Sequence, residues 1–120
     1  MREIKFRGRE QDGFWTYGDL RHEGNITGIV ENGIYSWVDS STVGQFTGLY
    51  DADGREIYEG DILSNGNDVV VVEYKPEWAS FIGLYYGRND ITLCLDECVR
   101  DLKIIGNIHD DPKLLEASHD

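Results

Sequence analysis

Basic residues and cysteine are both scarce in this sequence of 120 residues. Lys and Arg number 11 against 23 Asp and Glu, which gives a formal net charge of −12. Because nucleic acid is densely negative, proteins that bind it usually carry a basic surface, and the chain as a whole lacks the composition for one. Its two cysteines, Cys94 and Cys98, exclude a disulfide-built scaffold.

Long apolar runs and glycine-rich phosphate loops are absent as well. No apolar stretch approaches the roughly 20 residues that a membrane span requires. Neither GxxxxGK[ST] nor GxGxxG occurs in the sequence, so no nucleotide-binding loop is indicated. The chain opens with the charged, strand-like segment 1–5. We therefore expect no signal peptide and, with so few cysteines, a cytoplasmic location without membrane contact.

The residues that are present favour an ordered protein rich in turns and strands. Apolar residues make up 40% of the chain and aromatic residues 12%, with 14 glycines. This is enough apolar surface for a folded core. A chain of this length is typical of one domain.

Short apolar runs between turn residues predict strands in the first third of the chain. The segment 4–7 alternates apolar and basic side chains, which predicts Ile4 and Phe6 inward and Lys5 and Arg7 outward. Asn32-Gly33 between two apolar runs is the strongest local indication of a hairpin. The polar segment that follows is expected to connect strands, with one helical turn at most. The strands expected here are 4–7, 14–20, 26–30 and 34–38, and the polar connection is 39–42.

The segment 44–63 holds the densest turn chemistry. Asp and Gly residues in 51–54 predict a tight chain reversal, because Asp bonds backbone amides two residues on and Gly adopts positive φ without a steric cost. A second turn is expected at 59–61. The acidic side chains of this segment do not fit a calcium loop, because the Gly and Glu positions of that motif fail. We expect them to be solvated turn carboxylates: Asp51, Asp53, Glu56, Glu59 and Asp61.

The last half of the chain continues the same alternation of strands and turns. The run 69–74 is β-branched and predicts a strand with little solvent exposure. Pro112 near a first turn predicts a short C-terminal helix over 112–117, capped by Asp110 or Asp111. A helical turn is expected at 96–100. The other expected strands are 81–86, 91–95 and 102–108, and the expected turns are 64–68, 75–80 and 87–90.

Together these elements predict a mainly β fold with minor α content. From Tyr58 onward their order is similar to that of an SH3-like barrel. We expect an N-terminal β-meander packed on a C-terminal SH3-like small barrel, followed by the short helix. The domain is a single unit over 1–120, with a possible subdivision into 1–43 and 44–120.

The run VGQFTGLYDADGREIYEGDIL, the opening REIKFRG with W.YGDL, and the closing IGNIHDDPKLL resemble the YopX family of phage and prophage proteins. The resemblance covers essentially the whole chain. It implies a small bacteriophage protein in a bacterial host cell, and it carries over no catalytic residue. Eight positions match the family signature as a pattern: Gly44, Gln45, Gly48, Gly54, Tyr58, Glu59, Gly60 and Asp61.

No catalytic, cofactor or metal site stands out among the residues. Cys94 and Cys98 are four apart with no second cysteine pair, and the three histidines are scattered, so a zinc site is disfavoured. Buried core cysteines are the favoured interpretation. A nucleophilic cysteine with His109 as its base would need an arrangement that the spacing does not predict. We expect no enzyme activity and no small-molecule ligand.

Aromatic side chains and uneven charge are the remaining candidates for binding. Residues 1–21 carry a net charge of +1 and residues 22–120 a net charge of −13. Simple solubility is the favoured explanation, while electrostatic self-assembly and a basic partner surface stay open. Aromatic residues that could stack with bases or sugars are expected to pack internally instead, apart from Trp78, which follows Pro76 in a polar loop and is the candidate contact. The aromatic residues concerned are Trp15, Tyr17, Tyr35, Trp37, Trp78, Tyr85 and Tyr86.

The sequence therefore favours a phage accessory protein that acts through protein contacts, including self-association through exposed strand edges. The alternative is a role with nucleic acid. Either a basic N-terminal strip binds it, or the acidic body mimics DNA towards a host protein. The strip consists of Lys5, Arg7, Arg9 and Arg21.

Overall fold

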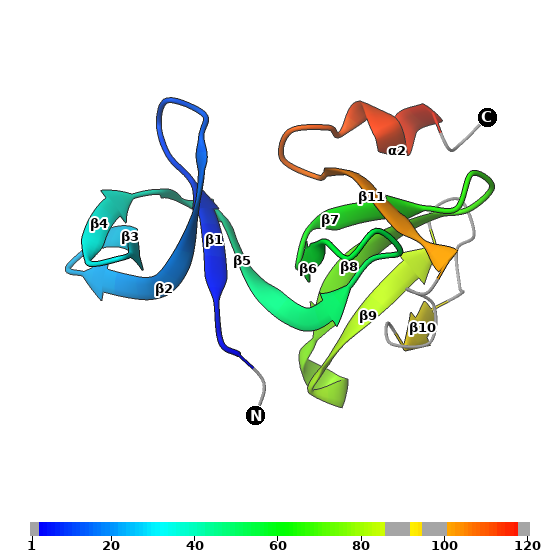
Figure 1. Cartoon of the computed structure of the whole chain (residues 1–120), viewed down its shortest axis with the longest axis horizontal. Helices are drawn as coiled ribbons and strands as arrows, with labels where there is room; N and C mark the ends of the chain where they lie inside the picture. Colours follow the sequence, from blue (N-terminus) through cyan, green and yellow to red (C-terminus); the bar gives the residue numbers. More distant parts are fainter. Residues whose placement is uncertain (1–2, 86–91, 95–100, 118–120) are drawn as a thin grey trace. The chain divides into compact units, whose positions relative to one another are not determined.

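The computed structural model describes residues 3–85, 92–94 and 101–117. The protein is mainly β, as the sequence predicts, and its antiparallel strands form two sheets (Figure 1). Its contacts divide it into two compact units, Met1–Gly48 and Leu49–Asp120. The division falls a few residues after the subdivision at 43/44 considered above. No helix among the described residues has the length and apolar character needed to cross a membrane.

The N-terminal unit is built from five strands that pair mostly with their sequence neighbours. They belong to a sheet with the order β4-β3-β2-β1-β5-β6, whose last strand, β6 (Glu56–Tyr58), comes from the C-terminal unit. The turn between β3 and β4 has positive φ at both Asn32 (53°) and Gly33 (81°). This is the geometry that the Asn-Gly pair predicts for a two-residue hairpin. The strands are β1 (Phe6–Arg9), β2 (Trp15–Glu23), β3 (Ile26–Glu31), β4 (Ile34–Trp37) and β5 (Asp39–Tyr50).

The helical turn expected over 39–42 is wrong, because these residues begin β5. Asp39 pairs with Arg9 across an irregularity in the β1–β5 ladder. There the Thr42 hydroxyl accepts a hydrogen bond from the Arg9 amide (2.9 Å) and donates one to the Asp39 carbonyl (2.6 Å). The strand β1 thus supplies hydrogen-bond partners that local sequence chemistry could not reveal.

The C-terminal unit contains a sheet with the order β10-β9-β8-β7-β11. Over the described residues this sheet is open, with β10 and β11 at its edges, and does not close into a barrel. The loop 64–68 is a turn in which the Asn65 side chain accepts hydrogen bonds from the amides of Asn67 and Asp68. The strands are β6 (Glu56–Tyr58), which pairs with β5, then β7 (Asp61–Ser64), β8 (Val69–Lys75), β9 (Ser80–Tyr85), β10 (Thr92–Cys94) and β11 (Lys103–Asn107).

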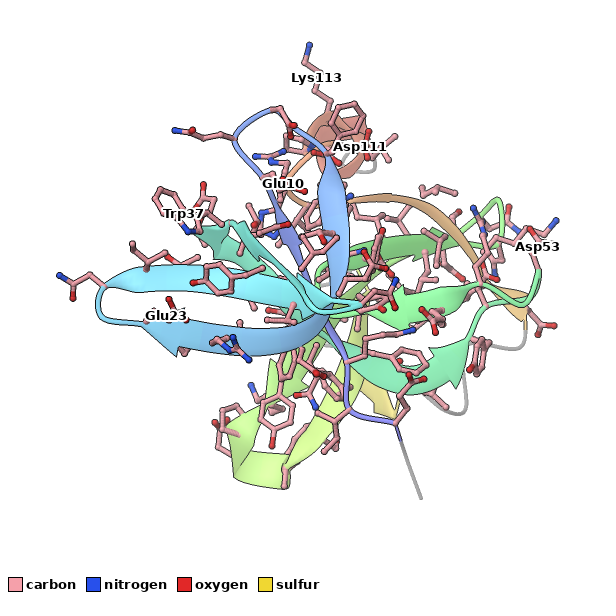
Figure 2. All side chains as sticks on the ribbon, turned by 60° about the vertical axis from the view of Figure 1, so that its left-hand side comes forward. Glu10, Glu23, Trp37, Asp53, Asp111 and Lys113 are labelled. Carbon is pink, nitrogen blue, oxygen red and sulfur yellow. The ribbon has the colours of Figure 1, made fainter. Side chains whose placement is uncertain are left out.

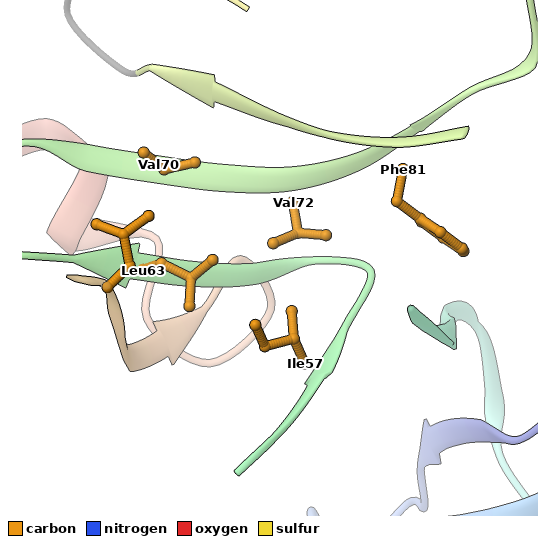
Figure 3. Packing of buried hydrophobic residues seen from close by; sticks show 6 residues of the cluster. Ile57, Leu63, Val70, Val72 and Phe81 are labelled. Carbon is orange, nitrogen blue, oxygen red and sulfur yellow. The ribbon is translucent and has the colours of Figure 1, made fainter. Parts of the chain in front are cut away.

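The core of the C-terminal unit lies against this sheet. As predicted, the β-branched run of β8 is central to it, with Val70 and Val72 both fully buried. Figure 3 shows side chains from β6, β7, β8 and β9 gathered around one apolar space. The cluster consists of Ile57, Leu63, Val70, Val72, Phe81 and Leu102.

Among the residues that the structure describes, the unit also has two short helical segments: η1 (Pro76–Trp78) and α2 (Lys113–Ala117). The expected cap of α2 is not formed by the Asp111 side chain. Its carboxylate accepts a hydrogen bond from the Asn107 amide (3.1 Å), while the Asp110 carboxylate accepts one from the Asn107 side-chain amide (3.2 Å). Both carboxylates therefore stabilise the turn that precedes the helix. The helical turn expected at 96–100 lies outside the described residues.

Candidate interaction surface of the N-terminal unit

The family-signature segment contains a buried carboxylate, Asp51, and not the solvated one expected. Its Oδ1 accepts hydrogen bonds from the amides of Asp53 and Arg55, both at 2.9 Å. Its Oδ2 accepts one from the Ile104 amide at 2.9 Å and lies 3.1 Å from Arg55 Nη2. The same Nη2 donates to the Ile104 carbonyl at 2.7 Å. Asp51 and Arg55 thereby fasten the turn 51–55 to β11.

The surroundings of Asp51 favour its charged form. Burial by itself would raise its pKa, but the hydrogen bonds from the amides of Ile104, Arg55 and Asp53, together with the charge of Arg55, outweigh that effect and hold the pKa below its usual value. The oxygens of this carboxylate are occupied by the chain itself. Its role is therefore to stabilise the fold.

Asp61 is the second buried carboxylate of the segment, 2% exposed, where solvation was expected. Its Oδ2 accepts a hydrogen bond from the Tyr58 amide at 2.7 Å. Between them Gly60, with φ of 93°, donates its amide to the Val72 carbonyl and accepts from the Ile108 amide, both at 2.9 Å. The turn thus ties β6 and β7 to β8 and to the end of β11.

The residues of the family signature therefore lie in turns or in strands that pair with neighbouring strands. Gly54 has φ of 83° in the first turn, and Gly44 and Gln45 pair with β1. Among the described residues, no three His, Cys, Asp or Glu side chains gather as a metal site would require. The structure gives the signature positions a part in folding: Gly44, Gln45, Gly48, Gly54, Tyr58, Glu59, Gly60 and Asp61 all lie in β5, in β6, at the start of β7 or in their connecting turns.

The basic strip expected at the N-terminus is not contiguous. Arg7 was expected to face outward, but it is only 6% exposed and its guanidinium lies 4.8 Å from the centre of the Trp15 ring. Ile4, expected inward, is exposed. The alternation prediction was wrong for two reasons: β1 begins only at Phe6, so Ile4 lies outside the strand, and the face that carries Arg7 is covered by Trp15 of the paired strand β2. The stacked position of Arg7 removes one of the charges that a nucleic-acid surface would use.

Trp78 is exposed, at 59%, which agrees with its place in a polar loop. It ends η1, and Lys75 Nζ lies 5.8 Å from the centre of its ring. Whether Trp78 contacts a partner stays a prediction. Of the two cysteines, Cys94 ends β10. Cys98 and the side chains of both cysteines lie outside the described residues, and so does the disfavoured arrangement of a nucleophilic cysteine with His109 as its base.

The N-terminal unit exposes apolar side chains on its β3–β4 hairpin, which the sequence did not indicate. Ile34 is 68% exposed and Trp37 is 67% exposed, and Ile26 adds to the same hairpin. Trp37 was expected to pack internally; Figure 2 shows its side chain on the outside of the ribbon. The strand β4 forms the end of its sheet and pairs there with β3.

An open pocket of 890 Å³ adjoins Trp37. Three chain segments of the N-terminal unit line it. The first is the β1–β2 turn, the second is the start of β3, and the third is the passage from β4 into β5. The lining residues are Arg9, Glu10, Gln11, Asp12, Asn25, Ile26, Thr27, Trp37, Val38, Asp39 and Ser40.

One sequence feature hints at this arrangement. Gly28 lies in the middle of β3 and opposite Trp37, and a Cβ there would collide with the ring of Tyr35. Glycine within a strand often marks a close approach of this kind. Because Tyr35 packs over Gly28, it is the inner aromatic residue of β4, and Trp37 at the end of the strand stays exposed.

Comparison with known proteins agrees with the resemblance noted in the sequence. The family model described as "YopX protein" matches residues 2–116. No curated protein matches the chain. Among solved structures, the crystal structure of protein EF1440 from Enterococcus faecalis is similar. Its TM-score is 0.61 at 20% identity, and the match covers 96% of this chain and 99% of that one. At this identity the likeness concerns the fold alone.

Proposed function

This chain belongs to the YopX family, and from that premise we propose that it is a protein-binding module whose contact surface is the β3–β4 hairpin. One observation carries the proposal: Trp37 and Ile26, two large apolar side chains of paired strands, are exposed and line the same open pocket beside the strand that ends the sheet. Exposed apolar side chains that adjoin one another are typical of interaction sites.

The edge position adds a means of recognition. An extended segment of a partner can pair with the backbone of an edge strand, while side-chain pockets beside the strand select its sequence. Trp37 at the end of β4 supplies such a side chain, since tryptophan is enriched among residues that dominate binding energy. Self-association through this edge is the second form that the same surface would support.

The alternative role with nucleic acid has less support. The net charge is −12, and Arg7 stacks on Trp15 instead of facing solvent. Without Arg7, only three of the four basic residues of the strip could contact phosphate. Because the affinity for nucleic acid grows with the number of phosphates neutralised, this weakens the alternative.

The proposal includes a role for the protein without enzymatic activity, in the cytoplasm of a bacterium that carries a phage or prophage. We also propose that the C-terminal unit is related to SH3-like barrels. The strand order β7-β8-β9-β10, each paired with the next, supports that relation.

Site-specific photo-crosslinking tests the function. A benzophenone amino acid replaces Trp37 in one form of the protein and Trp78, the other exposed tryptophan, in a matched control. After irradiation in cells, the position-37 form should yield a discrete crosslinked protein that resists nuclease. A band at twice the chain's mass would indicate self-association. No product from position 37, or a product only from position 78, would contradict the proposal.

A further inference from the structure

The pocket beside Trp37 has the volume of a binding site and a mostly polar lining. Its 890 Å³ falls within the range of about 300 to 1,000 Å³ that is typical of ligand pockets. All of its lining residues belong to the N-terminal unit. It combines an exposed indole with polar and charged side chains, so a ligand could meet an apolar surface and charged groups together.

The charges around the pocket are mainly negative. Three carboxylates line it, those of Glu10, Asp12 and Asp39, against one cation, Arg9. The Arg9 guanidinium lies 6.0 Å from the centre of the Trp15 ring. Acidic lining with one cation, in a protein of net charge −12, attracts positive ligands and repels negative ones.

Two of the three carboxylates, those of Asp39 and Asp12, are held in place by local turns. Asp39 Oδ1 accepts hydrogen bonds from the Ser41 amide (3.0 Å) and hydroxyl (2.8 Å). Asp12 Oδ1 accepts one from the Phe14 amide (3.1 Å). Such preorganisation lowers the cost of ordering the site when a ligand binds.

The indole of Trp37 completes the chemistry. An ammonium or guanidinium over an indole face is attracted by the ring, and carboxylates nearby can add charge-assisted hydrogen bonds to the same cation. Trp37 is also the last residue of edge strand β4, where an extended peptide could pair.

We propose that this pocket binds a lysine or arginine side chain of an extended, basic peptide segment, with the cation over Trp37 and among the pocket carboxylates. The inference rests on the proposed function and names the chemistry of the partner. A second copy of the chain fits the site less well, because it would bring the same carboxylates against these. Nucleic acid is disfavoured by the same sign of charge.

The test uses the full chain and a nine-residue peptide of alternating lysine and valine, with an alternating glutamate and valine peptide as its counterpart. Binding is followed by the Trp37 indole resonance in NMR spectra labelled with ¹⁵N. The lysine peptide should shift this resonance, and its affinity should fall as salt rises. Trp37→Ala, for which binding is followed by the backbone amide resonances of the pocket residues, should weaken binding about tenfold, which corresponds to about 1.4 kcal/mol.

Two glutamates offer a matched pair for the charge. Glu10 lines the pocket, whereas Glu23 lies at the end of β2 and does not; both are labelled in Figure 2. Glu10→Gln should weaken the lysine peptide about threefold more than Glu23→Gln. The inference would be overturned if Glu10→Gln and Glu23→Gln weakened binding equally, or if the glutamate peptide bound as well as the lysine peptide. It would also be overturned if a sugar probe, cellotetraose, shifted the Trp37 resonance and the lysine peptide did not.

The outcomes separate this inference from the proposed function. If position 37 crosslinks to a protein while the lysine peptide does not bind, the proposed binding module is supported and the proposed cation-binding pocket is refuted. If the peptide binds at Trp37 but no crosslink forms in cells, the pocket stands and the function fails.

Discussion

The Asp51 carboxylate accepts a hydrogen bond from the Ile104 backbone amide at 2.9 Å, across 53 residues of sequence. This contact joins the most characteristic turn of the chain to its last strand. It also explains why an acidic residue of the segment 51–61, whose carboxylates could suggest a calcium loop, has a structural role instead. The carboxylate binds the protein's own backbone.

Asp51→Asn should destabilise the protein by about 3 kcal/mol. The side-chain amide would bring N–H donors towards the N–H groups of Arg55 and Ile104, and the charge-assisted bonds would be lost. Urea unfolding at pH 7 measures the change. The control is Asp53→Asn, since Asp53 is half exposed and lies 3.7 Å or more from its cations; it should cost no more than about 1 kcal/mol.

The contribution of Asp51 should depend on pH in a defined direction. Its pKa is lower in the folded state than in the unfolded chain, so its stabilising effect is complete above the unfolded value of about 4 and is lost as the pH falls through the folded value. The difference in unfolding free energy between wild type and Asp51→Asn should therefore shrink below about pH 4. A difference that stays constant from pH 7 to pH 2.5 would show that the charge of Asp51 does not matter.

Gly54 should be required because of its positive φ, and not because a larger side chain would collide with its neighbours. Its φ is 83°, and a Cβ there would meet nothing within 4 Å. Gly54→Ala should cost about 1 kcal/mol, the strain of a left-handed residue. Gly54→Asn should cost less than half as much, because Asn tolerates this conformation. Equal losses for both variants in denaturant unfolding would argue against this explanation.

Arg7 should contribute to stability and not to nucleic-acid binding. Its guanidinium stacks on Trp15 at 4.8 Å, so Arg7→Ala should cost about 2 kcal/mol through lost packing and cation–π attraction. Arg21 is exposed, and Arg21→Ala should change stability by no more than about 0.5 kcal/mol. Thermal unfolding compares the two. If both variants were equally stable and either one altered retention on a DNA column, the result would support nucleic-acid binding by the basic strip.

The features that could be predicted from the sequence are those that depend on residues close together in the chain. The Asn32-Gly33 hairpin and the turn at 51–54 follow from the backbone preferences of Asn, Asp and Gly, and the burial of Val70 and Val72 follows from an uninterrupted apolar run. The strand at 39–42 could not be predicted, because its partner Arg9 lies far away in sequence.

The candidate site was missed for a related reason. Alternation along a strand says which side chains share a face, but it does not say which face is covered. Tyr35 and Trp37 look equivalent in the sequence, and only the packing of Tyr35 over Gly28 separates them. The burial of Arg7 and Asp51 likewise depends on Trp15 and Ile104, which no local pattern identifies.

The central claim is that Trp37 contacts the partner while the signature residues maintain the fold. The most direct measurement compares partner recovery from host lysate by wild type, Trp37→Ala and Trp78→Ala, with thermal unfolding of each. We predict that Trp37→Ala keeps the wild-type Tm to within about 3 °C yet loses recovery at least about tenfold, while Trp78→Ala keeps both. Full recovery by Trp37→Ala, or its loss by Trp78→Ala alone, would contradict the account.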